Sequence, residues 1–320
     1  MGRLLSYSGI STKIRAMQSK LISESEIQEM LQFTSVSHAA AWLKRTPEYA
    51  KAWADLDENS LHRGQIEKLL KASIFKDFSK IYQFANPEQR KFLDLYSRRY
   101  EIRVLKEIMT NLFDHKSTDA VDVSPYCDFF RRHSKLDLDR LTACTTMDEF
   151  INTLKGNEFY VPLSRIQNHD TALLFDYGMA LDLYYFSMIW NVRKKLFSGK
   201  DLEQITTAYG EKFDMLNLQF ISRSKRYFSM SPADIYALLI PMNYKLKKEE
   251  ITALVEASTR EEAQQIFRKT YYAKSMIIFL PTISKNSIII CSVPLWKRHP
   301  ARIPIPWQCF IPTCTTRSTK

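Results

Sequence analysis

The sequence predicts an all-α protein built from three related helical units, and three observations support this. Only seven of the 320 residues are glycine. Long stretches rich in Leu, Glu, Lys, Ala and Gln lack the alternation that is typical of strands. The pattern at residues 30–49 recurs twice without a gap, so that Ser35 falls on Thr146 and then on Ser258. A period this long indicates similar small domains and not a short solenoid repeat.

Each copy of this repeat has the features of one capped helix. A Ser or Thr begins it, and in the second and third copies a Glu three residues later suits a capping box. An apolar residue follows eight positions after the cap, on the face expected to be buried, and a Tyr comes after the helix end. The matched residues are Ser35, Thr146 and Ser258; Glu149 and Glu261; Leu43, Leu154 and Ile266; and Tyr49, Tyr160 and Tyr272.

The first unit is expected to span residues 1–115. It opens with apolar residues at helical spacing, and a capping signal follows at Ser23 with Glu26. Residues 51–115 predict two long helices separated near Asn86-Pro87. The second of these helices carries an apolar stripe formed by Ile102, Leu105, Ile108 and Leu112.

The second unit is expected over residues 116–228, with a polar linker at residues 114–125 before it. Its segment 176–190 is apolar enough to suggest a membrane span. However, Asp176 and Asp182 interrupt the segment, and the basic run at 193–195 closes it too early for a bilayer. The segment is therefore predicted to be a buried helix.

The third unit is expected to begin at residue 229 and to run to residue 274. Ser231 is placed to cap a short helix that has Pro232 at its first position and ends at Pro241. A shift close to the repeat period also carries Glu101-Ile102 onto Asp214-Met215. The long helix before each linker is therefore predicted to repeat as well.

No catalytic, cofactor-binding or metal-binding residues are predicted, and the chain is not expected to be an enzyme. It has no G-x-x-x-x-G-K-[ST], G-x-G-x-x-G, H-E-x-x-H or G-x-S-x-G motif, and its six histidines form no pair at metal-ligand spacing. Asp137-Leu138-Asp139 is better explained as a solvated turn beside basic residues. Five cysteines without a C-x-x-C pair fit a reducing compartment.

The formal net charge of +11 is unevenly distributed along the chain. Residues 1–274 hold 40 basic and 35 acidic groups, an excess of 5, and the last 46 residues add six basic groups and no acidic one. Arg98, Arg99 and Arg103 interleave with tyrosines, as a nucleic-acid surface would require. Pairing with Glu101 or exposure to water is the simpler interpretation of these arginines, and the charge of the main body gives little support to a nucleic-acid partner.

Three stretches resemble the family of the C subunit of V/A-type (vacuolar-type) ATPases, which is related to the d subunit of eukaryotic V-ATPases. They are Y-S-G-I-S-T-K-I-R-A-M-Q-S-K-L-I at residues 7–22, Y-E-I-R-V-L-K at 100–106, and L-N-L-Q-F-I-S-R-S-K-R-Y-F-S-M-S-P-A-D-I at 216–235 with L-I-P-M-N-Y-K-L at 239–246. The resemblance covers residues 5–274. It implies three similar helical domains around a pseudo-threefold axis, forming a funnel, with the third domain incomplete in this chain.

This resemblance also implies a function. The chain is expected to be a non-catalytic central-rotor subunit that couples the central shaft to the membrane proteolipid ring for ion transport, on the cytoplasmic side of the membrane. Its expected partners are the shaft subunits and the ring, with no cofactor, small-molecule substrate or nucleic acid. The alternatives are a helical scaffold and a basic nucleic-acid-binding protein.

The segment from Ser275 onward is predicted to be a frameshift product without a native fold. After Lys274 the chain has no acidic residue and no Gly, but it holds six of its twelve Pro, three of its five Cys and two of its five Trp. If one base was lost upstream, each original codon joined the last base of one present codon to the first two bases of the next. Met and Trp have one codon each, and both end in G, so the original residue can be deduced at three positions. Met276-Ile277 becomes Asp, Trp296-Lys297 becomes Glu and Trp307-Gln308 becomes Ala.

Overall fold

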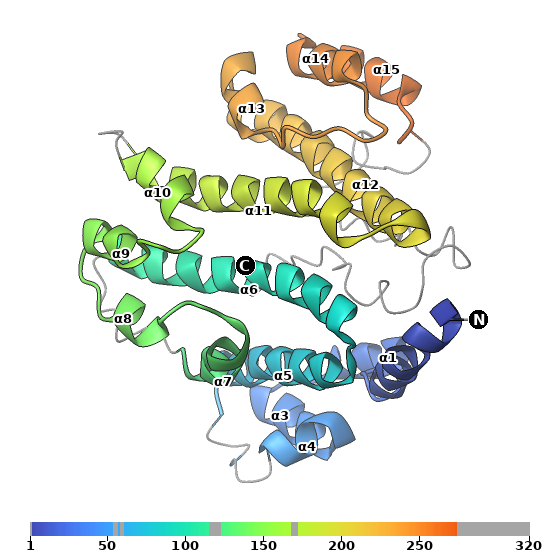
Figure 1. Ribbon diagram of the computed structural model, residues 1–320, viewed down its shortest axis with the longest axis vertical. Coiled ribbons are helices and arrows are strands. Elements are labelled where there is room, and N and C mark those ends of the chain that lie inside the picture. The colour runs from blue at the N-terminus through green and yellow to red at the C-terminus, as the bar shows by residue number, and fades with distance from the viewer. Residues whose placement is uncertain (1, 54–56, 58–60, 115–122, 168–171, 274–320) are drawn as a thin grey trace. The chain divides into compact units, whose positions relative to one another are not determined.

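The computed structural model describes residues 2–53, 57, 61–114, 123–167 and 172–273, and every regular element within these ranges is helical (Figure 1). This confirms the predicted all-α class. The chain divides into two compact units, Met1–Leu174 and Phe175–Lys320, which differ from the three repeat units predicted from the sequence. From here on, first unit and second unit denote these two compact units.

The first unit begins with the helices α1 (Gly2–Gln18), α2 (Glu24–Met30), α3 (Val36–Arg45), α4 (Pro47–Trp53) and α5 (Arg63–Phe84). α3 packs against α4, and α1 packs against α5. A buried core joins α3, α4 and α5, and it consists of Ala40, Leu43, Trp53, Leu61 and Ile66. Leu43 therefore lies in the core, as the repeat predicted.

The first unit continues with α6 (Pro87–Phe113), α7 (Ser124–His133), α8 (Leu138–Thr142), α9 (Met147–Thr153) and α10 (Tyr160–Gln167). α7 packs on both α5 and α6, and α9 packs on α6. Aromatic rings fill the space between α5, α6 and α7. Phe129 lies edge-on to Phe75 and to Phe78, with centroid distances of 5.1 Å, and Tyr100 of α6 meets the same rings. Each such pair adds about 0.5–1.5 kcal/mol beyond area burial.

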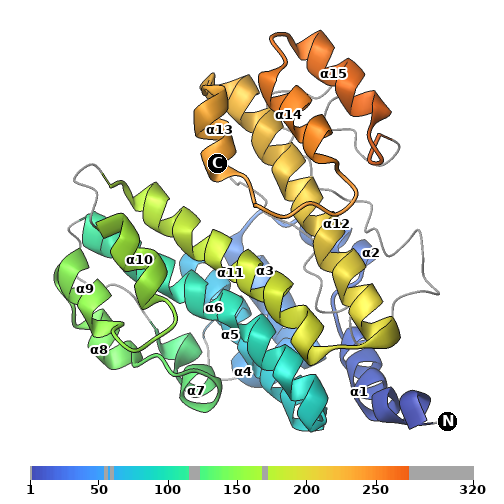
Figure 2. The ribbon, with the colours of Figure 1, turned by 45° about the horizontal axis from the view of Figure 1, so that its top comes forward.

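The second unit holds α11 (Leu174–Leu196), α12 (Gly199–Arg223), the π-helical turn η2 (Ser224–Phe228), α13 (Pro232–Leu238), α14 (Lys248–Glu256) and α15 (Arg260–Lys269). α13 and α14 pack against α12, and α15 packs against α14 (Figure 2). The core of this unit includes Leu218, Ile221, Ile235, Leu254, Phe267 and Tyr272. α11 meets α12 through rings, because Phe186 and Trp190 both lie against Phe213.

Three capping signals and the apolar stripe predicted from the sequence are confirmed. Ser23 forms a capping box with Glu26, and Asn86 caps α6 with Pro87 in its first turn. Ser231 caps α13, with Pro232 at the first position. All four residues of the stripe on α6 are buried.

The apolar segment 176–190 is part of α11, which buries Tyr177, Leu181, Tyr185 and Ile189. The segment is therefore helical, as predicted, but it is buried along one face only, and its other side chains are partly exposed. Among the described residues, no helix combines the length and apolarity that crossing a membrane requires. The middle of the predicted linker, residues 115–122, and the tail from residue 275 lie outside the described residues.

The repeat helix of the third copy begins one residue later than predicted. Ser35 caps α3 and Thr146 caps α9, but α15 is capped by Thr259, whose side chain accepts the amide N–H of Glu262. The match to Ser258, Glu261 and Ile266 is therefore wrong. Ser258 matched the capping position of the repeat because it also carries a hydroxyl group. The core residue eight positions after Thr259, the residue that caps the helix, is Phe267, which is 3% exposed.

A single shift, the one that carries Glu101 onto Asp214, relates α6 to α12 and the second repeat helix, α9, to the third, α15. It brings buried residues of α6 onto buried residues of α12: Tyr96 onto Tyr209, Ile102 onto Met215, Leu105 onto Leu218 and Ile108 onto Ile221. The same shift pairs Leu141 with Leu254 and Phe159 with Tyr272. Tyr272 thus corresponds to Phe159, not to Tyr160. The long helix does repeat, while the unit boundaries at 115 and 228 remain predictions.

Candidate functional site

A buried carboxylate on α12 organises the second unit. The side chain of Asp214 is fully buried and accepts the backbone N–H groups of Tyr244 at 2.9 Å, Lys245 at 2.6 Å and Leu246 at 2.9 Å. It also accepts the hydroxyl of Tyr272 at 2.8 Å. Four donors therefore satisfy one carboxylate, and they fix the 244–246 loop and the segment after α15 to the middle of α12.

Asn217, one turn further along α12, holds the same loop at a second point. Its side-chain oxygen accepts the Ile240 N–H at 2.8 Å, and its Nδ2 donates to the Ile240 carbonyl at 3.0 Å. Tyr244 also lies directly over Gly210, because a Cβ on Gly210 would fall 2.5 Å from the Tyr244 ring. The loop is thus fixed by hydrogen bonds and by a close approach that glycine permits.

The first unit has a related clamp at the equivalent position of α6. Glu101 is 1% exposed and accepts a hydrogen bond from Arg98 Nη1 at 2.8 Å. Arg98 Nε lies 2.7 Å from the carboxylate of Glu158, in the segment after α9. Burial raises the pKa of the Glu101 carboxyl, and the Arg98 guanidinium opposes this rise. Arg98 therefore joins α6 to the segment that follows the repeat helix.

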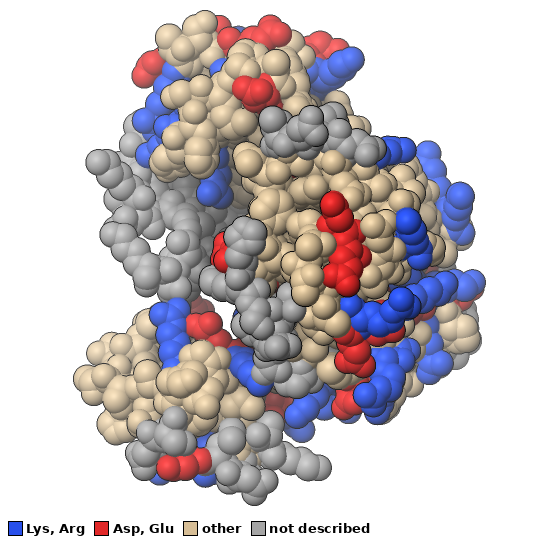
Figure 3. Space-filling view, turned by 90° about the vertical axis from the view of Figure 1, so that its left-hand side faces the viewer, with Lys and Arg blue, Asp and Glu red and all other residues tan. Residues whose placement is uncertain are grey.

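The basic–aromatic residues of α6 are largely engaged within the protein. Arg99 donates to the Tyr96 hydroxyl at 2.8 Å, and its guanidinium lies 5.2 Å from the Tyr96 ring centroid. Arg98 forms the ion pairs described above, which confirms its predicted pairing with Glu101. Figure 3 shows acidic side chains among the basic ones on the face that it displays. That face therefore presents no continuous basic surface for nucleic acid.

The other candidate groups have structural roles. Asp137 caps α8 by accepting the Arg140 N–H at 3.1 Å. Cys144 is buried, which raises the pKa of its thiol, and the thiol donates to the Arg140 carbonyl. In the ranges that the structure describes, no group of three or more His, Cys, Asp and Glu residues is arranged to hold a metal ion.

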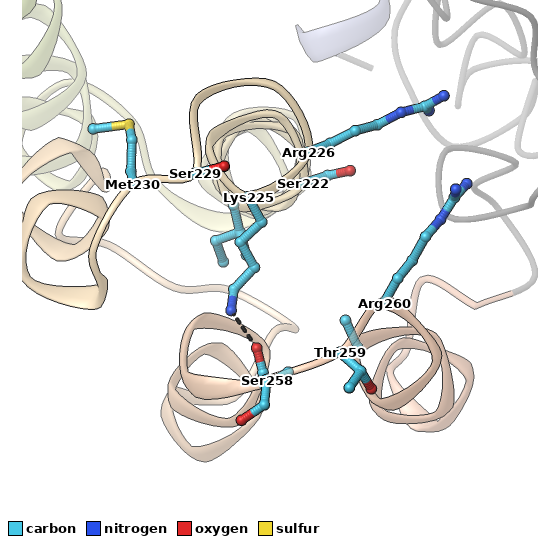
Figure 4. Close-up of a pocket in the computed structure, with 11 residues that line it drawn as sticks. Ser222, Lys225, Arg226, Ser229, Met230, Ser258, Thr259 and Arg260 are labelled. Carbon is cyan, nitrogen blue, oxygen red and sulfur yellow. Dashed lines mark hydrogen bonds between the residues drawn. The ribbon is translucent and has the colours of Figure 1, made fainter.

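A pocket of about 490 Å³ lies between η2 and the connection from α14 to α15 (Figure 4). Its lining includes three cations and four hydroxyl side chains: Lys225, Arg226 and Arg260, with Ser222, Ser229, Ser258 and Thr259. Lys225 Nζ donates to the Ala257 carbonyl at 2.6 Å. Burial lowers the pKa of the Lys225 ammonium, and the carboxylate of Glu262 opposes this effect. Among the described residues that line the pocket, none is acidic.

The sequence reveals the clamps only in part. The match of Glu101 to Asp214 predicted only that the long helix repeats, and the partners of the two carboxylates are distant along the chain. Asp214 binds residues 30 to 58 positions away, and no local pattern predicts such pairs. The pocket gave no signal in the sequence either, because its lining comes from two separate segments.

Comparison with known proteins gives a consistent result. Residues 10–286 match the model of the ATP synthase (C/AC39) subunit family. The C subunit of the A-type ATP synthase of Methanocaldococcus jannaschii is 21% identical over 289 residues, covering 89% of this chain and 71% of the relative. The protein of the same name from Methanosarcina mazei is 23% identical, with 78% and 67% covered. That of Thermococcus kodakarensis is 21% identical, with 73% and 61% covered.

Proposed function

The chain belongs to the ATP synthase (C/AC39) subunit family, and on this premise we propose that it is a non-catalytic central-rotor subunit of a V/A-type rotary ATPase. In this role it couples the central shaft to the membrane proteolipid ring for ion transport, as a peripheral protein on the cytoplasmic side. The match over residues 10–286 is the observation that carries the proposal.

The long helices of the chain and the contacts that hold other segments to them support this role. Transmitting torque requires a body that does not twist and surfaces that do not slip. α5, α6, α11 and α12 have 22, 27, 23 and 25 residues, so α6 is a rod of about 40 Å. The clamps at Asp214, Asn217 and Arg98 tie neighbouring segments to these rods, and side chains so held resist local opening.

Purification from membranes tests the proposal. A tagged chain, expressed in the organism from which it comes, is isolated from detergent-solubilised membranes after nuclease treatment, and its partners are identified by mass spectrometry. We expect the head, shaft and ring subunits of a rotary ATPase to co-purify. Recovery with nucleic acid that high salt removes would indicate the nucleic-acid alternative. Recovery with unrelated proteins alone would indicate a scaffold.

The absence of catalysis is tested separately. The purified chain is expected to show no ATP hydrolysis, because its sequence has no glycine-rich phosphate-binding motif. Turnover that persists through further purification and disappears on substitution within this chain would contradict the proposal.

A further inference from the structure

The pocket beside η2 lies at a position where the corresponding helices of the first unit, α6 and α9, carry apolar side chains. Under the shift that carries Glu101 onto Asp214, the lining residues of α12, η2 and α15 fall on apolar residues of α6 and α9, whereas Ser258 and Thr259 fall on the exposed Thr145 and Thr146. Ser222 falls on Met109 (0% exposed), Lys225 on Leu112 (6%) and Ala263 on Phe150 (0%). Arg226 and Arg260 fall on Phe113 and Met147. The two regions thus differ in side-chain chemistry at this point.

These differences between the two regions leave more space in the second unit and place charged side chains there. Ala263 occupies less space than Phe150, which leaves room beside α15. Lys225, Arg226 and Arg260 give the lining three positive charges, and Glu262 acts on Lys225 from outside the lining. An anion that enters the pocket is attracted to these cations.

The basic side chains come from both sides of the pocket. In Figure 4 Lys225 points from η2 toward the α14–α15 connection, while Arg226 and Arg260 extend from opposite walls toward the same side. Thr259 Oγ1 accepts the Glu262 N–H at 3.1 Å, an interaction that leaves its hydroxyl proton for a ligand. Guanidinium, ammonium and hydroxyl groups are the donors that recognise phosphate oxygens.

The backbone of this wall is also unusual. Ser224–Phe228 form a π-helical turn, and Ser229 follows in the left-handed conformation with φ of 47°. Such features cost free energy and occur preferentially at functional sites. Tyr227 and Phe228 on the same turn are 55% and 66% exposed.

We propose that this pocket binds the phosphate group of a ligand, with Lys225, Arg226 and Arg260 as its charged donors. The phosphate belongs either to a free anion or to the headgroup of an acidic lipid, and the exposed rings of η2 are suited to the second source. The proposal concerns the chain by itself and does not depend on the proposed rotor function.

The test compares two double variants of the full chain that lose the same charge. Lys225→Ala with Arg260→Ala removes pocket cations. Arg268→Ala with Lys269→Ala removes two cations at the C-terminal end of α15. Binding of inorganic phosphate is measured by calorimetry at constant ionic strength. Binding to phosphatidylcholine vesicles with and without phosphatidylglycerol is measured by sedimentation. The basic tail is identical in all chains and does not affect the comparison.

We expect the pocket variant to lose about tenfold or more in affinity, while the control variant binds like the parent. If the pocket variant has lower affinity for inorganic phosphate in the calorimetric titration, the ligand is a free anion. Loss only with phosphatidylglycerol vesicles identifies a lipid headgroup. No saturable binding of either probe, or equal loss in both variants, overturns the proposal. If the pocket double variant does not fold, Arg260→Ala alone replaces it, since the capping hydrogen bond of α15 comes from Thr259 and not from that side chain.

Discussion

At the scale of single residues, Asp214 is expected to contribute more to stability than its exposed neighbours. Asp214→Ala leaves three backbone N–H groups and the Tyr272 hydroxyl without their acceptor, and each unpaired buried donor costs about 1–3 kcal/mol. We expect the free energy of unfolding to fall by about 3 kcal/mol or more. Hydrogen exchange of the amides of residues 244–246 should accelerate together.

Glu203→Ala is the matched control for this substitution. It removes a carboxylate from an exposed position of the same helix, so the change should stay within about 0.5 kcal/mol. Amides of residues 244–246 that stay protected in Asp214→Ala would show that other contacts hold the loop.

His133 is expected to make the first unit less stable in acid. Its ring lies 4.3 Å from the Tyr82 centroid and 5.3 Å from that of Phe129. Burial lowers its pKa below 6.5, and Asp94 opposes this effect while Arg132 and Arg90 reinforce it. The unfolded chain therefore binds more protons than the folded chain just below pH 6.5, and stability falls as the pH falls through this window.

The variant His133→Phe should remove this contribution. Urea unfolding at about pH 7.5 and at about pH 5.5 is expected to show a smaller acid-induced loss in His133→Phe than in the parent, because the variant has no imidazole to protonate. His38→Gln, at an exposed position of α3, serves as the control. Its free energy of unfolding should fall between the two pH values by as much as that of the parent. An identical loss in all three chains would exclude His133 as a source of acid sensitivity.

At the scale of elements, two helical glycines should respond in opposite ways to alanine. A Cβ on Gly9 of α1 meets nothing within 4 Å, so Gly9→Ala should stabilise by up to about 1 kcal/mol through helix propensity. A Cβ on Gly210 would fall 2.5 Å from Tyr244, so Gly210→Ala should destabilise by about 1–3 kcal/mol despite the better propensity.

A double-mutant cycle tests the cause of this difference. Tyr244→Gly should cost less in the Gly210→Ala background than in the parent, because removing the ring also relieves the clash. Thermal unfolding of the four chains gives the coupling. If the two substitutions change stability additively, Tyr244 can move away from a Cβ at position 210 without a cost in free energy, and the close contact with Gly210 does not constrain the helix.

Elements were predictable where local chemistry determines them. Ser23, Asn86 and Ser231 cap helices because each side chain reaches an amide three residues away, within one stretch of sequence. The third copy of the repeat was misaligned by one residue because Ser258 and Thr259 both carry hydroxyls. Only the hydrogen bond to the Glu262 amide distinguishes them. The clamps of Asp214 and the basic pocket depend on segments distant along the chain, and residue pattern alone does not bring these together.

At the scale of the whole molecule, the chain changes character after Lys274. The family match ends at residue 286, inside a segment without acids or Gly. This segment lies outside the described residues, and its composition and the codons of its Met and Trp residues indicate how it arose. We propose that a base lost near the codons for Ala273-Lys274 displaced the frame, which would leave the third domain without the helices that complete it.

Resequencing the gene tests this last proposal. In the displaced frame, the codons must give Asp across Met276-Ile277, Glu across Trp296-Lys297 and Ala across Trp307-Gln308, and we expect that frame to stay open through residue 320. Restoring it should yield a chain with acids in the tail and apolar residues at helical spacing. Completed by its missing helices, the third domain should bury more apolar surface, so the restored chain should melt at a higher temperature than this one. Stop codons in the displaced frame soon after Lys274 would rule out the frameshift and make the basic tail a genuine part of the protein.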